Sequence, residues 1–300
     1  MLAVMAAFLF EYFSRKVRSI EQIDTMLDGG DGNSRILGTI FRWKSKDVKK
    51  GGLVTRDQPY GVYSEMFRQL RSGFHFARTA HNSGDSKAFV VTSATPADGK
   101  STITANLAVS IAHAGGSVII VDGDLRAPAL HSMFNLPELE PSGPPTGLGG
   151  LLMGSGRSPV DELVEVGIPG LKLLTGGTIS SNPADLLSLP GTKAIFDELR
   201  QHCDVLLIDS PPVLAAVDSM ILAGYADGVI VTVNMADSRL DVLQEAYRQV
   251  QTSGTPILGF VLNKVTNGAT SYGRYYERYG YSQKRSQKGG HGPKIEGSPS

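Results

Sequence analysis

The sequence has little of what several classes of protein require. Its single cysteine, Cys203, excludes an internal disulfide and fits a reducing compartment. The six histidines are scattered, and none is paired with cysteine or histidine at the spacing of a zinc site. No Gly-x-Gly-x-x-Gly motif follows a strand-like run, which disfavours a dinucleotide-binding fold. Lysine plus arginine (29) balances aspartate plus glutamate (29), and this balance argues against a general nucleic-acid binder.

The chain also lacks an apolar run long enough to cross a bilayer. Residues 1–13 are apolar up to Glu11, about half of the ~20 residues that a membrane-spanning helix needs. Basic residues at 15, 16 and 18 follow this run, whereas a signal peptide carries its positive charge in front. Two interpretations stay open. The run is either an amphipathic or core helix, or the cytoplasmic end of a truncated transmembrane helix that obeys the positive-inside rule.

The composition suits one ordinary α/β domain with appendages. Hydrophobic residues make up 41% of the chain and charged residues 19%, which is typical of a globular domain of about 200 residues. Residues 44–57 are charged and have little apolar content, as in a linker. We therefore divide the chain into a membrane-proximal segment (1–20), a linker (21–58), a globular domain (59–266) and a flexible tail (267–300).

From residue 88 onward, strand-like apolar runs alternate with helix-like segments. We expect strands at 88–93, 117–122, 204–209, 228–234 and 256–262, and helices at 100–114, around 148–153 and 184–188, and at 191–202, 213–224 and 238–253. Continuous apolar runs such as Val-Ile-Ile-Val indicate strands covered by helices on both faces. The pattern predicts an α/β fold with a doubly wound, mostly parallel sheet of the P-loop NTPase type.

The stretch 89–102 has the order of a phosphate-binding loop: an apolar run, a small-residue loop, and Gly-Lys-Ser-Thr opening a helix. Backbone N–H groups and the helix dipole favour an anion there. Lys100 would reach the β- and γ-phosphates, and Ser101 would hold Mg²⁺. The loop is a variant, because Ala94 replaces the usual first glycine. The residues that we expect to contact the nucleotide are Ala97, Asp98, Gly99, Lys100, Ser101 and Thr102.

Two further strands end in acidic residues. Asp122 and Asp124 follow the run at 117–122, and Asp209 ends the run at 204–209. Carboxylates at the ends of parallel strands lie beside a bound nucleotide in such folds. We expect Asp122 and Asp209 near the metal, with Ser101. Asn263, just past the last strand, either reaches the adenine or is a structural asparagine.

A charged helix opens the domain. Glu65, Arg68 and Arg71 recur every three residues and line one side of a helix for which Ser64 is the predicted N-cap. A solvated charged face is the ordinary explanation of such a pattern.

The C-terminal segment holds half of the ten tyrosines, interleaved with Arg274 and Arg278 and without helical or strand periodicity. We predict that this segment is disordered. A nucleic-acid stacking segment and a sticky low-complexity tail are the general alternatives. The tyrosines are Tyr272, Tyr275, Tyr276, Tyr279 and Tyr281.

Together these pieces resemble the bacterial tyrosine kinases of capsule and exopolysaccharide biosynthesis, the cytoplasmic part of polysaccharide co-polymerases. The resemblance covers nearly the whole chain. It rests on the variant phosphate loop (93–102), the Val-Asp-Gly-Asp-Leu-Arg motif (121–126) with Pro128, the Ile-Asp-Ser-Pro-Pro motif (208–212) and the tyrosine cluster (272–281). It makes 59–266 a P-loop tyrosine kinase domain.

The resemblance implies transfer of the γ-phosphate of Mg-ATP to the tyrosine cluster. Lys100 would offset charge on the transferred group, and Asp122 or Asp124 would accept the tyrosine proton. Glu65, Arg68 and Arg71 match the helix by which family members assemble into rings, where one copy would phosphorylate another. The further partners implied are a membrane activator segment, a cognate tyrosine phosphatase and the polysaccharide polymerase machinery, at the cytoplasmic face of a bacterial plasma membrane.

Two other functions compete with a kinase. A partitioning or positioning ATPase has a second lysine four residues before the last glycine of the loop, where this chain has Thr95, and lacks a tyrosine tail. A catalytically weak ATP-binding scaffold would keep the same motifs, since sequence does not report turnover. Phosphotyrosine on the tail would argue against both.

Overall fold

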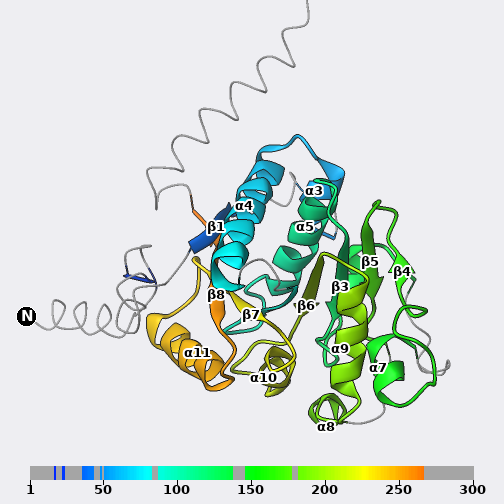
Figure 1. Cartoon of the computed structure of the whole chain (residues 1–300). Helices are drawn as coiled ribbons and strands as arrows, with labels where there is room; N and C mark the ends of the chain where they lie inside the picture. The colour runs from blue at the N-terminus through cyan, green and yellow to red at the C-terminus, as the bar shows by residue number, and fades with distance from the viewer. Residues whose placement is uncertain are drawn as a thin grey trace, which may run out of the picture.

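The computed structural model describes residues 17, 22–23, 36–43, 48, 51–82, 87–137, 146–177 and 182–266. Its centre is an eight-stranded sheet in the order β1-β8-β7-β2-β6-β3-β5-β4 (Figure 1). All neighbouring strands are parallel except β4 and β5. The strands are β1 (Ile36–Phe41), β2 (Ala88–Ser93), β3 (Val118–Asp122), β4 (Val164–Glu165), β5 (Leu171–Leu174), β6 (Val205–Asp209), β7 (Gly228–Asn234) and β8 (Ile257–Val265).

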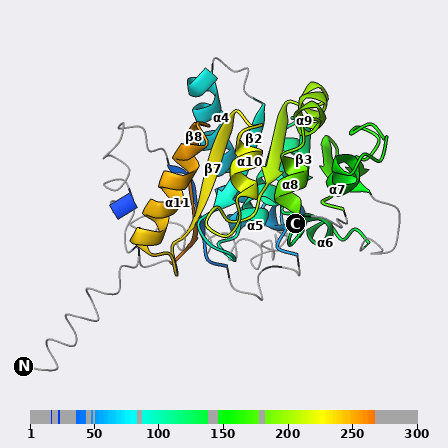
Figure 2. The ribbon, with the colours of Figure 1, turned by 90° about the horizontal axis from the view of Figure 1, so that it is seen from below.

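Helices cover both faces of this sheet. They are α3 (Val54–Asp57), α4 (Val62–Asn82), α5 (Lys100–Ala112), α6 (Leu130–Met133), α7 (Gly147–Leu152), α8 (Pro183–Leu187), α9 (Thr192–Gln201), α10 (Asp218–Ala223) and α11 (Leu240–Thr252). Side chains of β2 alternate between the two cores. Phe89 and Val91 pack in the larger core, with α4 and α5. Ala88 and Val90 pack in the smaller core, with α7 to α10. Figures 1 and 2 show α11, α10 and α8 following one another across the molecule.

The predicted fold class is confirmed, and five strands lie where the apolar runs predict them. The sequence pattern does not predict β1, β4 and β5. The last two have only two and four residues, too few for a clear period. The helix predicted at 213–224 begins only at Asp218. The backbone N–H of Val213 instead donates to the carbonyl of Ser93 (2.8 Å), which ties this segment to the end of β2.

Part of the predicted linker, 21–58, belongs to the domain. Strand β1 pairs with β8, and its Leu37 and Ile40 are buried. Helix α3 packs on α5, where Thr55 donates through its backbone N–H (3.1 Å) and hydroxyl (2.8 Å) to the amide oxygen of Asn106. Because residues 44–57 are rich in charge, the sequence pattern did not predict that this segment belongs to the domain. Nearly all of 1–20 and all of 267–300 lie outside the described residues. Within the described residues, no helix is long and apolar enough to cross a membrane.

The predicted cap of α4 is wrong. The helix begins at Val62, so Ser64 lies inside its first turn. A cap oxygen accepts from a backbone N–H, whereas the Ser64 hydroxyl donates to the carbonyls of Val54 (2.9 Å) and Gln58 (2.6 Å). Ser64 therefore fastens α4 to both ends of the short helix α3.

Candidate nucleotide-binding site

The site lies where three neighbouring strands, β2, β6 and β3, end at one edge of the sheet. Strand β2 leads through residues 94–99 into α5. The next two strands end in Asp209 and Asp122, which are partners in the parallel register of β6 and β3. Strand register therefore brings two acidic side chains together beside the start of a helix. That is the edge at which open α/β sheets bind ligands.

The loop before α5 has a conformation that needs small residues. Ala97 and Gly99 both have positive φ, 64° and 99°. A Cβ atom on Gly99 would lie 2.2 Å from the amide nitrogen of Asn263. The carboxylate of Asp98 points back into the loop and accepts from the backbone N–H (2.9 Å) and hydroxyl (3.1 Å) of Thr95. Burial raises the pKa of Asp98. The loop thus opens the first turn of the 13-residue α5 toward a ligand, and such a turn binds anions.

Lys100 lies among carboxylates at the start of α5. Its ammonium nitrogen is 2.8 Å from Asp124 Oδ2 and 3.9 Å from Asp209 Oδ2. It also lies 3.3 Å from the Ser101 hydroxyl. Burial works against its positive charge, but Asp209 and Asp124 outweigh burial and raise the pKa of Lys100. Lys100 is therefore a fixed positive charge at the position where the sequence predicts phosphates.

Asp122 and Asp209 are both fully buried. Burial, with the neighbouring Asp209 charge, raises the pKa of Asp122 to about 8. Burial also raises the pKa of Asp209 to about 6, although Lys100 opposes it. Asp122 Oδ2 accepts from the backbone N–H groups of Ala129 (3.0 Å) and Leu130 (2.9 Å). Asp122 Oδ1 and Asp209 Oδ2 are buried without a hydrogen-bond partner.

These two orphaned carboxylate oxygens fit a divalent cation. Mg²⁺ is typically bound by one or two carboxylates together with substrate phosphates and water. Within the described residues, no group of three or more histidine, cysteine, aspartate or glutamate side chains could hold a metal ion. A cation bound here would take part of its coordination shell from these two oxygens, with Ser101 nearby, and the rest from phosphates and water.

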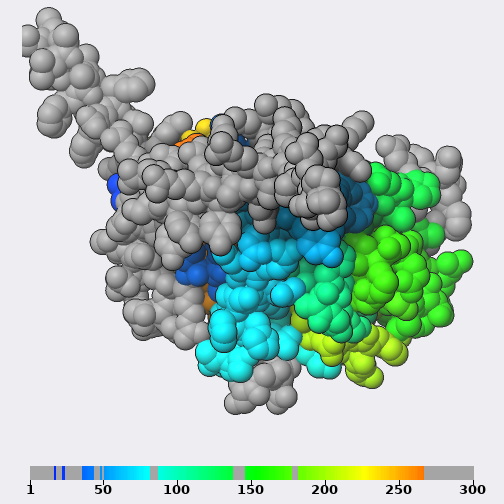
Figure 3. Space-filling model, turned by 90° about the horizontal axis from the view of Figure 1, so that it is seen from above, coloured from blue at the N-terminus to red at the C-terminus, as the bar shows by residue number. Residues whose placement is uncertain are grey.

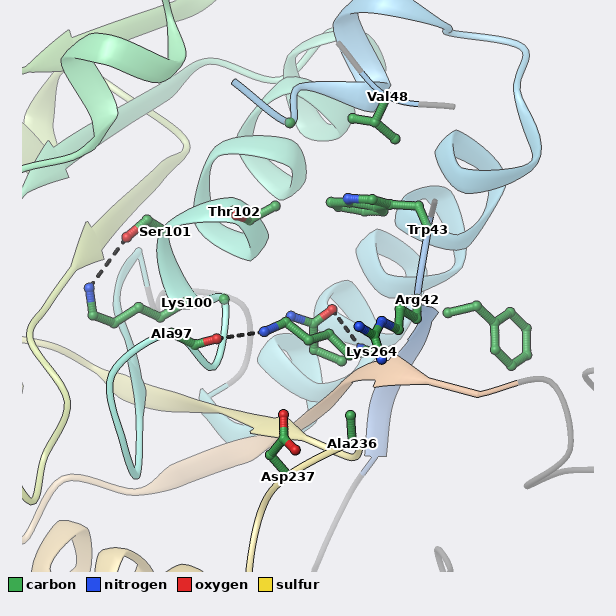
Figure 4. A pocket seen from close by; sticks show the side chains of 14 residues that line it. Arg42, Trp43, Val48, Ala97, Lys100, Ser101, Thr102, Ala236, Asp237 and Lys264 are labelled. Carbon is green, nitrogen blue, oxygen red and sulfur yellow. Dashed lines mark hydrogen bonds between the residues drawn. The ribbon is translucent and has the colours of Figure 1, made fainter. Parts of the chain in front are cut away.

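A cavity of about 810 Å³ opens from the phosphate loop (Figure 4). Its phosphate end is lined by Ala97, Gly99, Lys100, Ser101 and Thr102, its outer wall by Phe41, Arg42, Trp43, Val48 and Gly52, and its remaining wall by Ala236, Asp237, Asn263 and Lys264. The Trp43 ring extends across the cavity toward Thr102, with Val48 on the same side (Figure 4). The sequence does not predict the outer wall, because these residues lie in the segment interpreted as a linker.

The end of β8 braces the loop. The Asn263 amide donates to the carbonyl of Asp98 (2.8 Å), and the Lys264 ammonium donates to the carbonyl of Ala97 (2.7 Å). Lys264 itself has a positive φ of 55°, an uncommon conformation that the surrounding structure must enforce. These contacts favour the structural role for Asn263, although it also lines the cavity. No sequence motif pointed to Lys264.

The residues predicted to mediate assembly lie on α4, outside the cavity. Glu65 and Arg68 form an ion pair on the surface. Arg71 differs, because it turns inward and donates to the backbone carbonyl of Ser110 on α5 (2.7 Å). The tyrosine cluster lies outside the described residues.

The family model described as the CobQ/CobB/MinD/ParA nucleotide binding domain matches residues 89–284. This agrees with the parallel sheet, the phosphate loop and the acidic strand ends. The chain therefore contains a nucleotide-binding domain of the P-loop NTPase class.

More specific relatives define the family. The chain is 31% identical over 234 residues to the tyrosine-protein kinase YwqD of Bacillus subtilis, which covers 77% of this chain and 94% of that protein. It is 28% identical over 212 residues to the tyrosine-protein kinase CpsD of Streptococcus agalactiae, covering 70% and 87%. The crystal structure of the chimerical protein CapA2B2 superposes with a TM-score of 0.70 at 32% identity, covering 82% of this chain and 99% of that one. The chain belongs to the family of bacterial tyrosine-protein kinases.

Proposed function

We propose that this protein transfers the γ-phosphoryl group of ATP to protein tyrosines. The observation that carries the proposal is Lys100, held at the start of α5 within 4 Å of two buried carboxylates, at the end of a cavity of about 810 Å³. Family membership supports tyrosine as the acceptor. A nucleotide would place its phosphates on the first turn of α5 and its base toward the outer wall with Trp43.

Each residue of the site would have one role in the transfer. Lys100 would leave Asp124 for the phosphates and offset the charge that develops on the transferred group. Ser101, Asp122 and Asp209 would hold Mg²⁺, which would neutralise phosphate charge when bound. Asp122, Asp124 and Asp209 are the three carboxylates whose charges act on Lys100.

A tyrosine acceptor must also lose a proton. Its oxygen forms the bond to phosphorus, the bond from phosphorus to ADP breaks, and the phenolic proton passes to a carboxylate. A phenol has a pKa near 10, so a base whose pKa is near neutral serves best. Asp122 and Asp124 are the two candidates for this base, and both lie beside Lys100. If Asp122 is the base, Asp122→Asn lowers kcat at saturating Mg²⁺ far more than Asp124→Asn does. The reverse order would make Asp124 the base.

The decisive experiment is intact mass and peptide mapping after incubation with Mg-ATP, beside Lys100→Met. We expect phosphate on Tyr272, Tyr275, Tyr276, Tyr279 or Tyr281 in the native chain alone. ATP hydrolysis without phosphotyrosine would instead support a switch ATPase, and binding without turnover a scaffold.

We further propose that α4 joins copies of the chain into a ring, with Glu65 and Arg68 at the contact. Glu65 is exposed and Arg68 is half-buried, whereas Arg71 already bonds within its own chain and would support the helix. Arg68→Glu should lower the mass measured by light scattering and lower tail phosphorylation. Lys193→Glu, in the exposed Lys193–Asp197 pair of α9, is a matched control and should change neither. An unchanged mass in Arg68→Glu would refute this contact.

The cellular role follows from the resemblance. We propose that phosphorylation of the tail regulates polymerisation and export of a capsular or exopolysaccharide. The protein would act at the cytoplasmic face of the plasma membrane with a membrane activator segment and a cognate tyrosine phosphatase. Each phosphate adds about −1.5 to −2 charges, and repulsion among phosphorylated tails would release copies from the ring. Equal assembly of phosphorylated and dephosphorylated protein would contradict this.

A further inference from the structure

We propose that Tyr60 is a second kind of phosphorylation site in this chain, separate from the tyrosine cluster of the tail. The inference rests on the proposed kinase activity. Four tyrosines lie in the described residues, and three of them, Tyr63, Tyr225 and Tyr247, are half-buried. Tyr60 is 88% exposed. An aromatic side chain this exposed contributes little to the core, and its hydroxyl is open to a second molecule.

The backbone presents Tyr60 at the tip of a closed turn. The N–H of Gly61 donates to the carbonyl of Gln58 (2.8 Å), so Pro59 and Tyr60 are the two central residues of a four-residue turn. The Ser64 hydroxyl donates to the same Gln58 carbonyl (2.6 Å), which fastens the turn to α4. The turn thus holds Tyr60 away from the body of the domain. A tyrosine that enters the active site of another molecule must project in this way.

The surroundings of the turn favour a negative charge. Arg68 donates to the backbone carbonyl of Pro59 and also pairs with Glu65, so its guanidinium lies beside the turn. Helix α4, 21 residues long, begins two residues later at Val62. Its N-terminus carries partial positive charge. A phosphate on Tyr60, with about −1.5 to −2 charges, would compete with Glu65 for Arg68 and change the charge of the surface proposed for assembly. Figure 3 shows α4, in cyan, exposed beside α5.

The donor is a second copy of the chain. Tyr60 does not line the cavity that holds Lys100, so its hydroxyl does not face the phosphates of its own site. In the transfer, the Tyr60 oxygen bonds to the γ-phosphorus of ATP in the other copy. The bond from that phosphorus to ADP breaks, and the phenolic proton passes to the carboxylate base there.

The test uses the full chain with all five tail tyrosines replaced by phenylalanine, incubated with Mg-ATP. The tryptic peptide 57–68 contains both Tyr60 and Tyr63, so Tyr60→Phe and Tyr63→Phe are compared in this background. We expect phosphate on the peptide in the background chain and in Tyr63→Phe, and its loss in Tyr60→Phe and Lys100→Met. Unchanged Tm would show that the variants are folded.

A mixing experiment tests the second copy. Lys100→Met, which keeps Tyr60 but cannot transfer phosphate, is mixed with active chain that carries Tyr60→Phe. Phosphate on Tyr60 of the Lys100→Met chain is the expected result, and its absence would refute transfer between copies. Phosphate on the native tail with none on peptide 57–68 would overturn the role of Tyr60 and leave the kinase proposal standing. Native chain that carries no phosphate anywhere would overturn both.

Discussion

The two ends of the cavity are built in different ways. At the inner end, Lys100, Asp122 and Asp209 come from the start of α5 and the ends of two adjacent strands, and the two aspartates are fully buried. At the outer end, Trp43 and Val48 are half-buried and follow the edge strand β1. The pairing of β1 with β8 has two register irregularities. Central strands thus fix the charges that phosphate chemistry needs, while one irregular edge strand holds the other wall.

We expect the largest effect from replacing Lys100, the cation at the inner end of the cavity. Lys100→Met leaves Asp124 and Asp209 without their ammonium partner and removes the charge that we propose faces the phosphates. We expect tyrosine phosphorylation to fall by about 10² to 10³-fold, the usual loss for one electrostatic catalytic group. Phosphate incorporation measures the effect. Lys172→Met, which removes an exposed lysine that pairs with Glu165, is the control, and an equal loss there would contradict the assignment.

The buried carboxylates predict how stability depends on pH. The pKa of Asp122 rises from 3.8 to about 8 and that of Asp209 to about 6, so the folded protein binds more protons than the unfolded chain between about pH 4 and 8. The free energy of unfolding of the nucleotide-free protein should therefore fall as pH rises through this range. Asp122→Asn cannot ionise and should remove much of the fall, by a few kcal/mol at most.

Thermal unfolding across this pH range measures the effect. Mg-ADP should oppose the fall, because a cation favours the ionised carboxylates, so its stabilisation grows with pH. Asp185→Asn on α8, outside the cavity, is the control. A Tm that rises with pH in the native protein and in Asp122→Asn alike would show that Asp122 is ionised in the empty site.

The difference between the inner and outer ends of the cavity also explains which parts of the site could be predicted from the sequence. The β2, β3 and β6 runs are apolar on both faces, so their positions, the loop between β2 and α5, and the clustering of Asp122 with Asp209 all followed from the pattern. Register then required the two aspartates to meet. Nothing in the local sequence required Lys100 to pair with Asp124 more closely than with Asp209, because that depends on side-chain geometry.

The outer wall could not be predicted in the same way. Strand β1 reads Ile-Leu-Gly-Thr-Ile-Phe, a short run interrupted by glycine and followed by charged residues. Its place in the sheet depends on pairing with β8, more than 200 residues later. Gly38 is needed there, since a Cβ atom would lie 2.9 Å from the Leu70 backbone of α4. Such a close approach of helix and strand depends on tertiary packing, which cannot be predicted from a single sequence.

Ligands of different size can test whether Trp43 contacts the base and Lys100 the phosphates. Trp43→Ala removes the aromatic ring of the outer wall but leaves the phosphate end intact. We expect ADP to bind more weakly by about 1 to 3 kcal/mol, the range for a base stacked on an aromatic ring, while pyrophosphate binds as before. Lys100→Met should weaken both ligands. Titration calorimetry with each ligand separates the two ends.

The controls for Trp43 are another aromatic and a conservative change. Phe76→Ala removes an exposed ring of α4 that does not line the cavity and should leave both affinities unchanged. Trp43→Phe keeps an aromatic face and should recover most of the ADP affinity. Equal weakening of ADP and pyrophosphate in Trp43→Ala would mean that the ring acts on the phosphate loop and does not face the base.

The smallest effect on ligand binding is expected from Lys264, which contacts the phosphate loop from the end of β8. Lys264→Met removes the hydrogen bond to the Ala97 carbonyl (2.7 Å) but leaves the bond from Asn263 to Asp98. One hydrogen bond contributes about 0.5 to 1.5 kcal/mol, and the exposed position of this bond favours the lower end. We expect faster amide exchange in residues 94–99 and only a few-fold weaker binding of ADP and pyrophosphate alike. If Lys264→Met weakened both ligands as much as Lys100→Met does, Lys264 would be a phosphate ligand and the inner end would extend to β8.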